Sequence, residues 1–102
     1  MSKFVCARPI HPGEILKEEI EYRGISQGKL AAQMGISYKA LNNILNEKRP
    51  ITSQMAMLFE AALGIPAYML DGIQNDYNMQ VASRDKSLAE RIEQIRKAVA
   101  VF

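Results

Sequence analysis

Cysteine and histidine are nearly absent from this sequence. The 102 residues include one of each, Cys6 and His11, and no tryptophan. A single cysteine cannot form a disulfide within the chain, and one cysteine with one histidine cannot supply the four ligands of a structural zinc site. The two could pair as a nucleophile and a base, but no nearby residue would orient the histidine. We therefore expect no metal, no cofactor and no catalytic residue.

Long apolar runs are also absent. The longest run is a few residues, far short of the roughly 20 that cross a bilayer, and the stretch Met1 to Cys6 lacks the hydrophobic region of a secretory signal. Paired carboxylates in a plausible pocket, a phosphate-binding glycine loop and a His-Glu-x-x-His metal motif are missing as well. With 48% hydrophobic residues, the chain can still build the core of one compact domain. These absences favour a cytoplasmic protein that binds rather than catalyses.

Net charge is small, but its distribution is uneven. The formal net charge is +2. One segment holds five basic residues against one acid, Glu47, so that it carries +4 and the rest of the chain −2; the bases are Arg23, Lys29, Lys39, Lys48 and Arg49. Such a segment suits a phosphate backbone, although a solvated helical face could carry the same charges.

Helical spacing of apolar residues predicts an all-α fold, because no stretch alternates with a two-residue period. Serine, threonine and proline at helix starts, and glycine just past helix ends, set the expected limits. Five core helices follow: one from Pro12 to a stop at Gly24, one capped by Ser26 and stopped by Gly35, one capped by Ser37 and broken at Arg49-Pro50, one capped by Thr52 and stopped by Gly64, and one opened by Pro66 that ends near Asn78.

The C-terminal quarter is expected to be a connection and one more helix. Residues from Asn78 to Ser87 are polar and show no clear period, which indicates a loop. From Ser87 to about Val99 the apolar residues form a narrow seam, which consists of Leu88, Ile92, Ile95 and Val99. A lone helix of this length is marginal in water, so the seam should pack on something. Packing within the chain and contact with a second chain remain equal alternatives.

The segment from Ser26 to Arg49 has the pattern of a helix-turn-helix. Gly35 permits a tight turn between two capped helices, and the small Ala31 lets them cross closely. On the second of these helices the face opposite Leu41, Ile44 and Leu45 carries Lys39, Asn43 and Asn46, with Asn42 on its flank. Three asparagines are poorly explained by helix stability. Exposed polar residues without a partner are the competing explanation.

Asparagine can bond an adenine edge, and lysine can donate to guanine acceptors. We therefore expect base contacts from Tyr38, Lys39, Asn42 and Asn43. Phosphate contacts should come from the helix starts and the exit loop. The candidates for phosphate contact are Gln27, Ser37, Asn46, Lys48 and Arg49. Ser37 also has a plain role as an N-cap, and for Thr52 that role is the favoured one.

Together with these residues, several short segments make the chain resemble a known family between Ile10 and Met79. They are His11-Pro12-Gly13-Glu14, Gly24-Ile25-Ser26-Gln27, Gly35-Ile36-Ser37, Lys48-Arg49-Pro50-Ile51-Thr52 and Gln74-Asn75-Asp76-Tyr77. The chain resembles the lambda-repressor-like (XRE) helix-turn-helix superfamily and, within it, the HigA-type (virulence-associated protein I) antitoxins. It departs from the family pattern at Leu58 and Leu70, and at Asn78, where the family usually has aspartate.

The resemblance implies a five-helix lambda-repressor-like DNA-binding domain with an additional C-terminal helix. The predicted helices divide the chain into an N-terminal extension at residues 1–11, the DNA-binding domain at 12–78, and a connection with an amphipathic helix at 79–102. The resemblance also implies a homodimer that represses its own operon at a palindromic operator and neutralises a RelE-like, messenger-RNA-cleaving toxin.

Two other functions stay open at this point. One is a stand-alone or phage-type repressor without a toxin; the other is a helical interaction module that does not bind DNA. The acidic residues of the first helix, Glu14, Glu18, Glu19 and Glu21, could attract a basic toxin, but a solvated face is the simpler interpretation.

Overall fold

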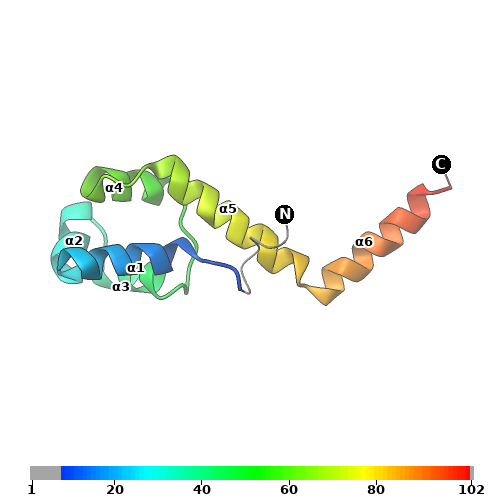
Figure 1. Ribbon diagram of the computed structural model, residues 1–102, viewed down its shortest axis with the longest axis horizontal. Coiled ribbons are helices and arrows are strands. Elements are labelled where there is room, and N and C mark those ends of the chain that lie inside the picture. Colours follow the sequence, from blue (N-terminus) through cyan, green and yellow to red (C-terminus); the bar gives the residue numbers. More distant parts are fainter. Residues whose placement is uncertain (1–7, 102) are drawn as a thin grey trace.

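Six α-helices make up the secondary structure of residues 8–101, the part of the chain that the computed structural model describes (Figure 1). The all-α prediction is confirmed. In chain order the helices are α1 (Pro12–Arg23), α2 (Gln27–Met34), α3 (Tyr38–Leu45), α4 (Ser53–Leu63), α5 (Ala67–Ser83) and α6 (Lys86–Val99).

Helix starts follow the capping residues that the sequence indicated. The hydroxyl oxygens of Ser26, Ser37 and Thr52 accept the backbone N–H groups of Lys29, Ala40 and Met55, at 3.3, 3.0 and 3.1 Å. Each bond satisfies one of the donors that a helix leaves unpaired in its first turn. The first four helices therefore begin and end within a residue or so of the predicted limits, except that α3 ends at Leu45, before Arg49-Pro50.

One apolar core joins α1 to α4 and the start of α5. Its largest member, Phe59, has no exposed surface, and neither do Leu16, Leu41 and Leu70. The other core side chains are Ile20, Leu30, Ala31, Met34, Ile44, Leu45, Ile51, Ala56 and Leu63. Within this core, α3 packs against α1 and α2.

The connection expected from Asn78 to Ser87 is wrong. Helix α5 runs 17 residues and ends at Ser83, so only Arg84 and Asp85 interrupt the helices. The segment contains no glycine or proline, and exposed helix turns need no apolar period to form. The carboxylate of Asp85 accepts the N–H of Leu88 at 3.3 Å and starts α6 one residue earlier than predicted.

Helix α6 projects from the domain as an arm, and the described part of the molecule extends over 58 × 28 × 20 Å (Figure 1). No residue of α6 is buried, and the seam side chains are 37–56% exposed. Packing within the chain, one of the two alternatives for the seam, is therefore not observed between residues 8 and 101. In the same range, no helix has the length and apolar character to cross a membrane.

Candidate nucleic-acid interface

The turn between α2 and α3 is built around Gly35. This residue adopts a left-handed conformation, with φ 73° and ψ 27°, which costs little only for glycine. The N–H of Ile36 then donates to the carbonyl of Ala31 at 3.0 Å, and Ile36 packs against the core. The chain thereby reverses in a few residues, and α3 packs across α2.

Helix α3 presents its polar face to solvent. Leu41, Ile44 and Leu45 are buried, whereas Lys39 and Asn46 are exposed. Tyr38 is 56% exposed at the start of the helix, and Asn42 and Asn43 are half-buried. The angular prediction from the sequence therefore holds for this helix: lysine and amide groups lie opposite the apolar side.

Two of the asparagines connect α3 to its neighbours. The amide of Asn42 donates to the side-chain carbonyl of Gln27 on α2 at 3.4 Å. The amide of Asn46 donates to the backbone carbonyl of Asn42 at 2.9 Å, while its carbonyl accepts the ammonium of Lys17 on α1 at 3.2 Å. Asn42 and Asn46 thus help to orient α3, a role that spacing along one helix does not reveal.

The exit from α3 is a compact turn that exposes two basic residues. Glu47 adopts φ 64°, and it is the one described residue other than glycine with a positive φ. Its N–H donates to the carbonyl of Ile44 at 3.0 Å, and the N–H of Lys48 donates to the carbonyl of Asn43 at 2.8 Å. This bonding pattern closes the helix end. Lys48 and Arg49 follow directly and are exposed, beside the outer face of α3.

The buried side chain of His11 contacts this exit turn and holds it in place. It is 2% exposed, its Nδ1 accepts the N–H of Gly13 at 2.9 Å, and it hydrogen-bonds the backbone of Arg49. Its ring meets that of Tyr77 edge to face, with centroids 4.9 Å apart. Burial lowers the pKa of His11, which Glu47 and the bond to Arg49 partly oppose. His11 is thus the N-cap of α1, while Cys6, its possible catalytic partner in the sequence, lies outside the described residues.

Gln74 holds the other end of the same loop. Its side-chain carbonyl accepts the buried N–H of Ile51 at 2.8 Å, and its amide donates to Asn78 at 2.9 Å. A buried N–H without a partner costs about 1–3 kcal/mol, so this contact fixes the loop path. His11, Gln74 and Tyr77 belong to segments that carry the family resemblance, and in the structure they position the loop after α3.

Gly13 is a further positioning residue that sequence reasoning missed. A Cβ at this position would lie 2.0 Å from the backbone carbonyl oxygen of Ile44. The first turn of α1 therefore touches the last turn of α3 so closely that only glycine fits. Its place in the His11-Pro12-Gly13-Glu14 segment was the available signal, but one sequence does not show what a glycine contacts.

The basic segment of the sequence divides in the structure. Lys29, Lys39, Lys48 and Arg49 are exposed, whereas Arg23 forms an ion pair with Glu19. On the acidic face of α1, Glu14 is held by Arg8 through two bonds of 2.8 Å, and this hydrogen bonding lowers the pKa of Glu14. The other four bases of this segment lie on α2, α3 and the exit turn.

Known proteins share this arrangement. The helix-turn-helix family profile matches residues 16–70. Virulence-associated protein I of Dichelobacter nodosus is 36% identical over 78 residues, which are 76% of this chain and 72% of that protein.

Solved structures agree with the sequence relatives. The antitoxin HigA of Pseudomonas aeruginosa, determined with the higBA promoter, is 32% identical with a TM-score of 0.76, over 85% of this chain and 94% of that one. A HigA-family addiction module antidote protein from Coxiella burnetii is 33% identical with a TM-score of 0.74, over the same shares of the two chains. The chain therefore belongs to the helix-turn-helix family and, within it, to the HigA-type (virulence-associated protein I) antitoxins.

Proposed function

We propose that this chain is a cytoplasmic, sequence-specific DNA-binding antitoxin that represses its own toxin–antitoxin operon. The observation that carries the proposal is the outer face of α3, where Lys39 and Asn46 are exposed and Asn43 is half-buried, beside the basic exit turn. A short helix of this kind can enter a major groove with its N-terminal residues against base edges. The structure of a HigA relative with promoter DNA supports the same use of this fold.

Base reading is assigned to the outer residues of α3. Lys39 can donate to guanine, and the Asn43 amide can both donate to and accept from an adenine edge. Tyr38 stands at the helix start, where a phenol can bond a phosphate or contact a thymine methyl. Asn42 is the fourth candidate. Its amide already donates to Gln27, so we expect Asn42 to reach a base only if the Gln27 side chain turns away to the phosphate backbone of the DNA.

Phosphate binding is assigned to the edges of this face. Lys48 and Arg49 are exposed on the turn that His11 and Gln74 hold in place. Gln27 and Ser37 stand at the starts of α2 and α3, where backbone N–H groups and the helix dipole favour an anion. Asn46 completes the set at the end of α3.

The proposed repressor is a homodimer. One α3 helix reads only a few base pairs, and two-fold dimers on palindromic half-sites supply the remaining affinity and specificity. Neutralisation of a RelE-like toxin is the second part of the proposal and rests on membership of the antitoxin family. The exposed Glu18 and Glu21 of α1 offer a basic toxin an acidic surface.

The test measures binding of the full chain to the DNA upstream of its gene, by fluorescence anisotropy, with a shuffled duplex as control. If Lys48 and Arg49 of both protomers each contact one phosphate, four phosphates are neutralised. The logarithm of the association constant should then fall with the logarithm of the salt concentration with a slope of roughly −3.6, since each phosphate contributes about −0.9. Equal affinity for the two duplexes would reject sequence-specific recognition, and affinity independent of salt would reject the phosphate contacts.

For the toxin, the neighbouring gene is expressed with and without this chain. Restored growth is expected with the chain present. Unchanged growth inhibition would leave a repressor without an antitoxin role.

A further inference from the structure

The side chain of Lys17 on α1 reaches the end of α3. Its ammonium donates to the side-chain carbonyl of Asn46 at 3.2 Å, across 29 positions of the chain. Asn46 is exposed on the outer face of α3, so this hydrogen bond places a cation from another helix beside that face. Helix spacing identifies the outward residues of α3 itself, and it cannot reveal a side chain that arrives from α1.

The close contact between α1 and α3 explains this placement. Gly13 lies against the carbonyl oxygen of Ile44, and Lys17 is one helical turn further along the same face of α1. A long side chain on a helix leans back toward the N-terminus of that helix, which here is toward the last turn of α3. Leu16 and Ile20 are buried, whereas Lys17 is half-buried, so its stem is partly covered while its ammonium reaches the surface.

The hydrogen bonds of Lys17 and Asn46 leave N–H donors at the surface. A lysine ammonium carries three N–H donors, and the Asn46 carbonyl is its one hydrogen-bond acceptor within residues 8–101. The Asn46 amide donates one N–H to the backbone carbonyl of Asn42 and retains the second. Because Lys17 holds the Asn46 carbonyl, the pair has donors left for a phosphate oxygen, which only accepts.

The nearby carboxylates do not replace Asn46 as the partner of Lys17. Glu21 is one turn further along α1, about 5.4 Å along the axis and away from the direction in which Lys17 leans. Glu18 lies about 100° round the helix. Asn46 is two positions before Lys48, so Lys17 reaches the same edge of α3 to which the phosphate contacts are assigned.

We infer that the ammonium of Lys17 binds a phosphate of the DNA backbone at the end of α3, and that Asn46 holds this ammonium in position. The inference rests on the proposed DNA binding, to which it adds a contact from outside the helix-turn-helix. The competing role is a hydrogen bond that only ties α1 to α3. The two roles differ in one measurable respect: a cation on a phosphate releases a counterion, whereas a bond within the protein does not.

The test measures the affinity of full-chain variants for the upstream DNA by fluorescence anisotropy as the salt concentration changes. Lys17→Gln removes the charge and keeps a donor for Asn46, whereas Lys17→Met removes both and keeps the apolar stem. With Lys17, Lys48 and Arg49 of both protomers on phosphates, the salt slope should be roughly −5.4, and it should be roughly −3.6 in both variants. Between about 50 and about 200 mM salt, the wild type should then lose affinity roughly 2,000-fold and each variant roughly 150-fold. Lys17→Arg keeps the charge and should keep the wild-type slope.

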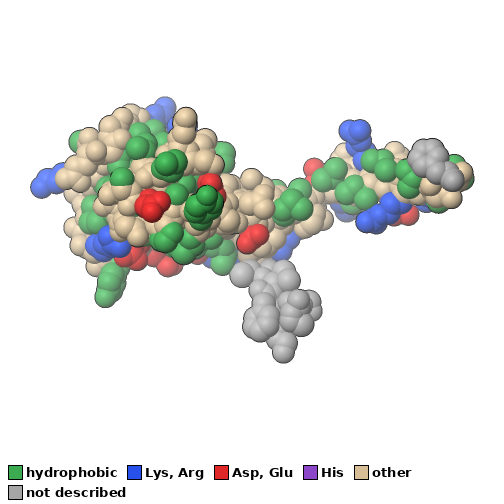
Figure 2. All heavy atoms as spheres, turned by 90° about the horizontal axis from the view of Figure 1, so that it is seen from above, with side chains coloured by type: hydrophobic (Ala, Val, Ile, Leu, Met, Phe, Trp, Pro, Cys, Tyr) green, Lys and Arg blue, Asp and Glu red, His purple; other side chains and the backbone are tan. Residues whose placement is uncertain are grey.

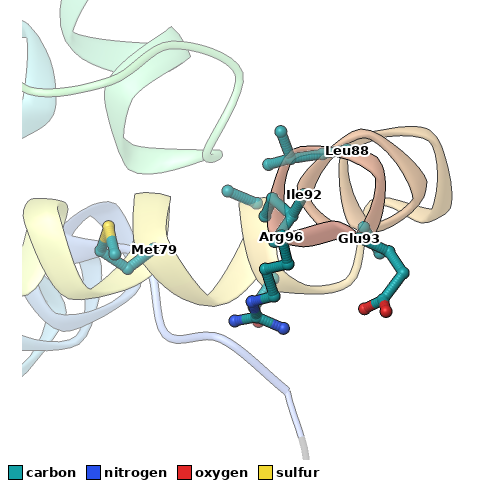
Figure 3. Close-up of a pocket in the computed structure, with 8 residues that line it drawn as sticks. Met79, Leu88, Ile92, Glu93 and Arg96 are labelled. Atoms are coloured by element: carbon teal, nitrogen blue, oxygen red, sulfur yellow. The ribbon is translucent and has the colours of Figure 1, made fainter. Parts of the chain in front are cut away.

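Lys97→Met is the matched control, because it removes the same charge from α6, at the opposite end of the molecule from α3 (Figure 1). Figure 2 shows Lys and Arg side chains on this arm. Arg96 is less suitable, since with Ile92 and Glu93 it lines an open hollow of about 440 Å³ between α5 and α6 (Figure 3). Lys97 is exposed and lines neither this hollow nor the seam, so its variant should keep the wild-type slope. Circular dichroism should show every variant folded.

Unchanged slopes in Lys17→Gln and Lys17→Met would overturn the inference, whether or not the affinity falls. A reduced slope in Lys48→Ala would then show that the proposed function stands without Lys17. Equal affinity for the upstream and shuffled duplexes, with slopes that fall in both Lys17 variants, would reject the sequence-specific function and keep the phosphate contact. A wild-type chain that binds neither duplex would overturn both.

Discussion

Replacement of Gly13 by alanine tests how α1 positions the recognition helix. The new Cβ would lie 2.0 Å from the Ile44 carbonyl oxygen, so one helix must shift by about 1.4 Å to restore ordinary contact at 3.4 Å. Overpacking of a dense site costs about 1–3 kcal/mol, and the upper end applies because the obstructing atom is backbone. Alanine recovers up to about 1 kcal/mol of helix propensity. The expected net loss is about 2 kcal/mol in the free energy of unfolding.

Urea unfolding followed by circular dichroism measures this loss. For a chain of this size, about 2 kcal/mol also lowers Tm by roughly 8–16 °C. The matched control is Gly72→Ala on α5, where a Cβ meets nothing within 4 Å and the chain should gain about 0.5–1 kcal/mol. Equal stability of Gly13→Ala and the wild type would refute the close approach of α1 to α3.

Two further predictions concern the exit turn. Burial holds the pKa of His11 below its ordinary value of 6.5, so the unfolded chain binds the extra proton first and stability should fall as the pH drops below about 6.5. His11→Asn keeps a capping side chain and should lose less stability between about pH 7.5 and about pH 5.5 than the wild type; an equal loss would contradict the role of His11. Lys48→Ala should weaken binding to all DNA sequences and reduce the salt slope by about one for each Lys48 that contacts a phosphate. An unchanged slope in an anisotropy titration would remove Lys48 from the phosphate contacts.

Local rules predicted the helices well where capping residues and apolar period agree. Ser26, Ser37 and Thr52 cap helices as expected, since a cap depends on residues only a few positions apart. The same rules failed for the polar stretch after Asn78, because an exposed helix turn has no inner face and so shows no period of apolar residues.

The outer face of α3 could be predicted from one helix, but its supports could not. Which residues oppose Leu41, Ile44 and Leu45 follows from helix geometry alone. The bonds from Lys17 to Asn46 and from Gln74 to Ile51 join positions 29 and 23 residues apart, and no pattern in a single sequence reveals such pairs. In the sequence, His11, Gln74 and Tyr77 could be recognised only as part of a family resemblance, not as the residues that position the loop after α3.

The most direct test of the central claim is the effect of Asn43→Ala on operator recognition. The wild-type and variant chains are titrated against the upstream DNA and a set of duplexes that each change one base pair. We predict a loss of about 1–3 kcal/mol for each half-site, with the discrimination lost at one base pair in each half-site and kept at the others. Unchanged affinity and unchanged discrimination at every position would contradict the placement of α3 in the major groove.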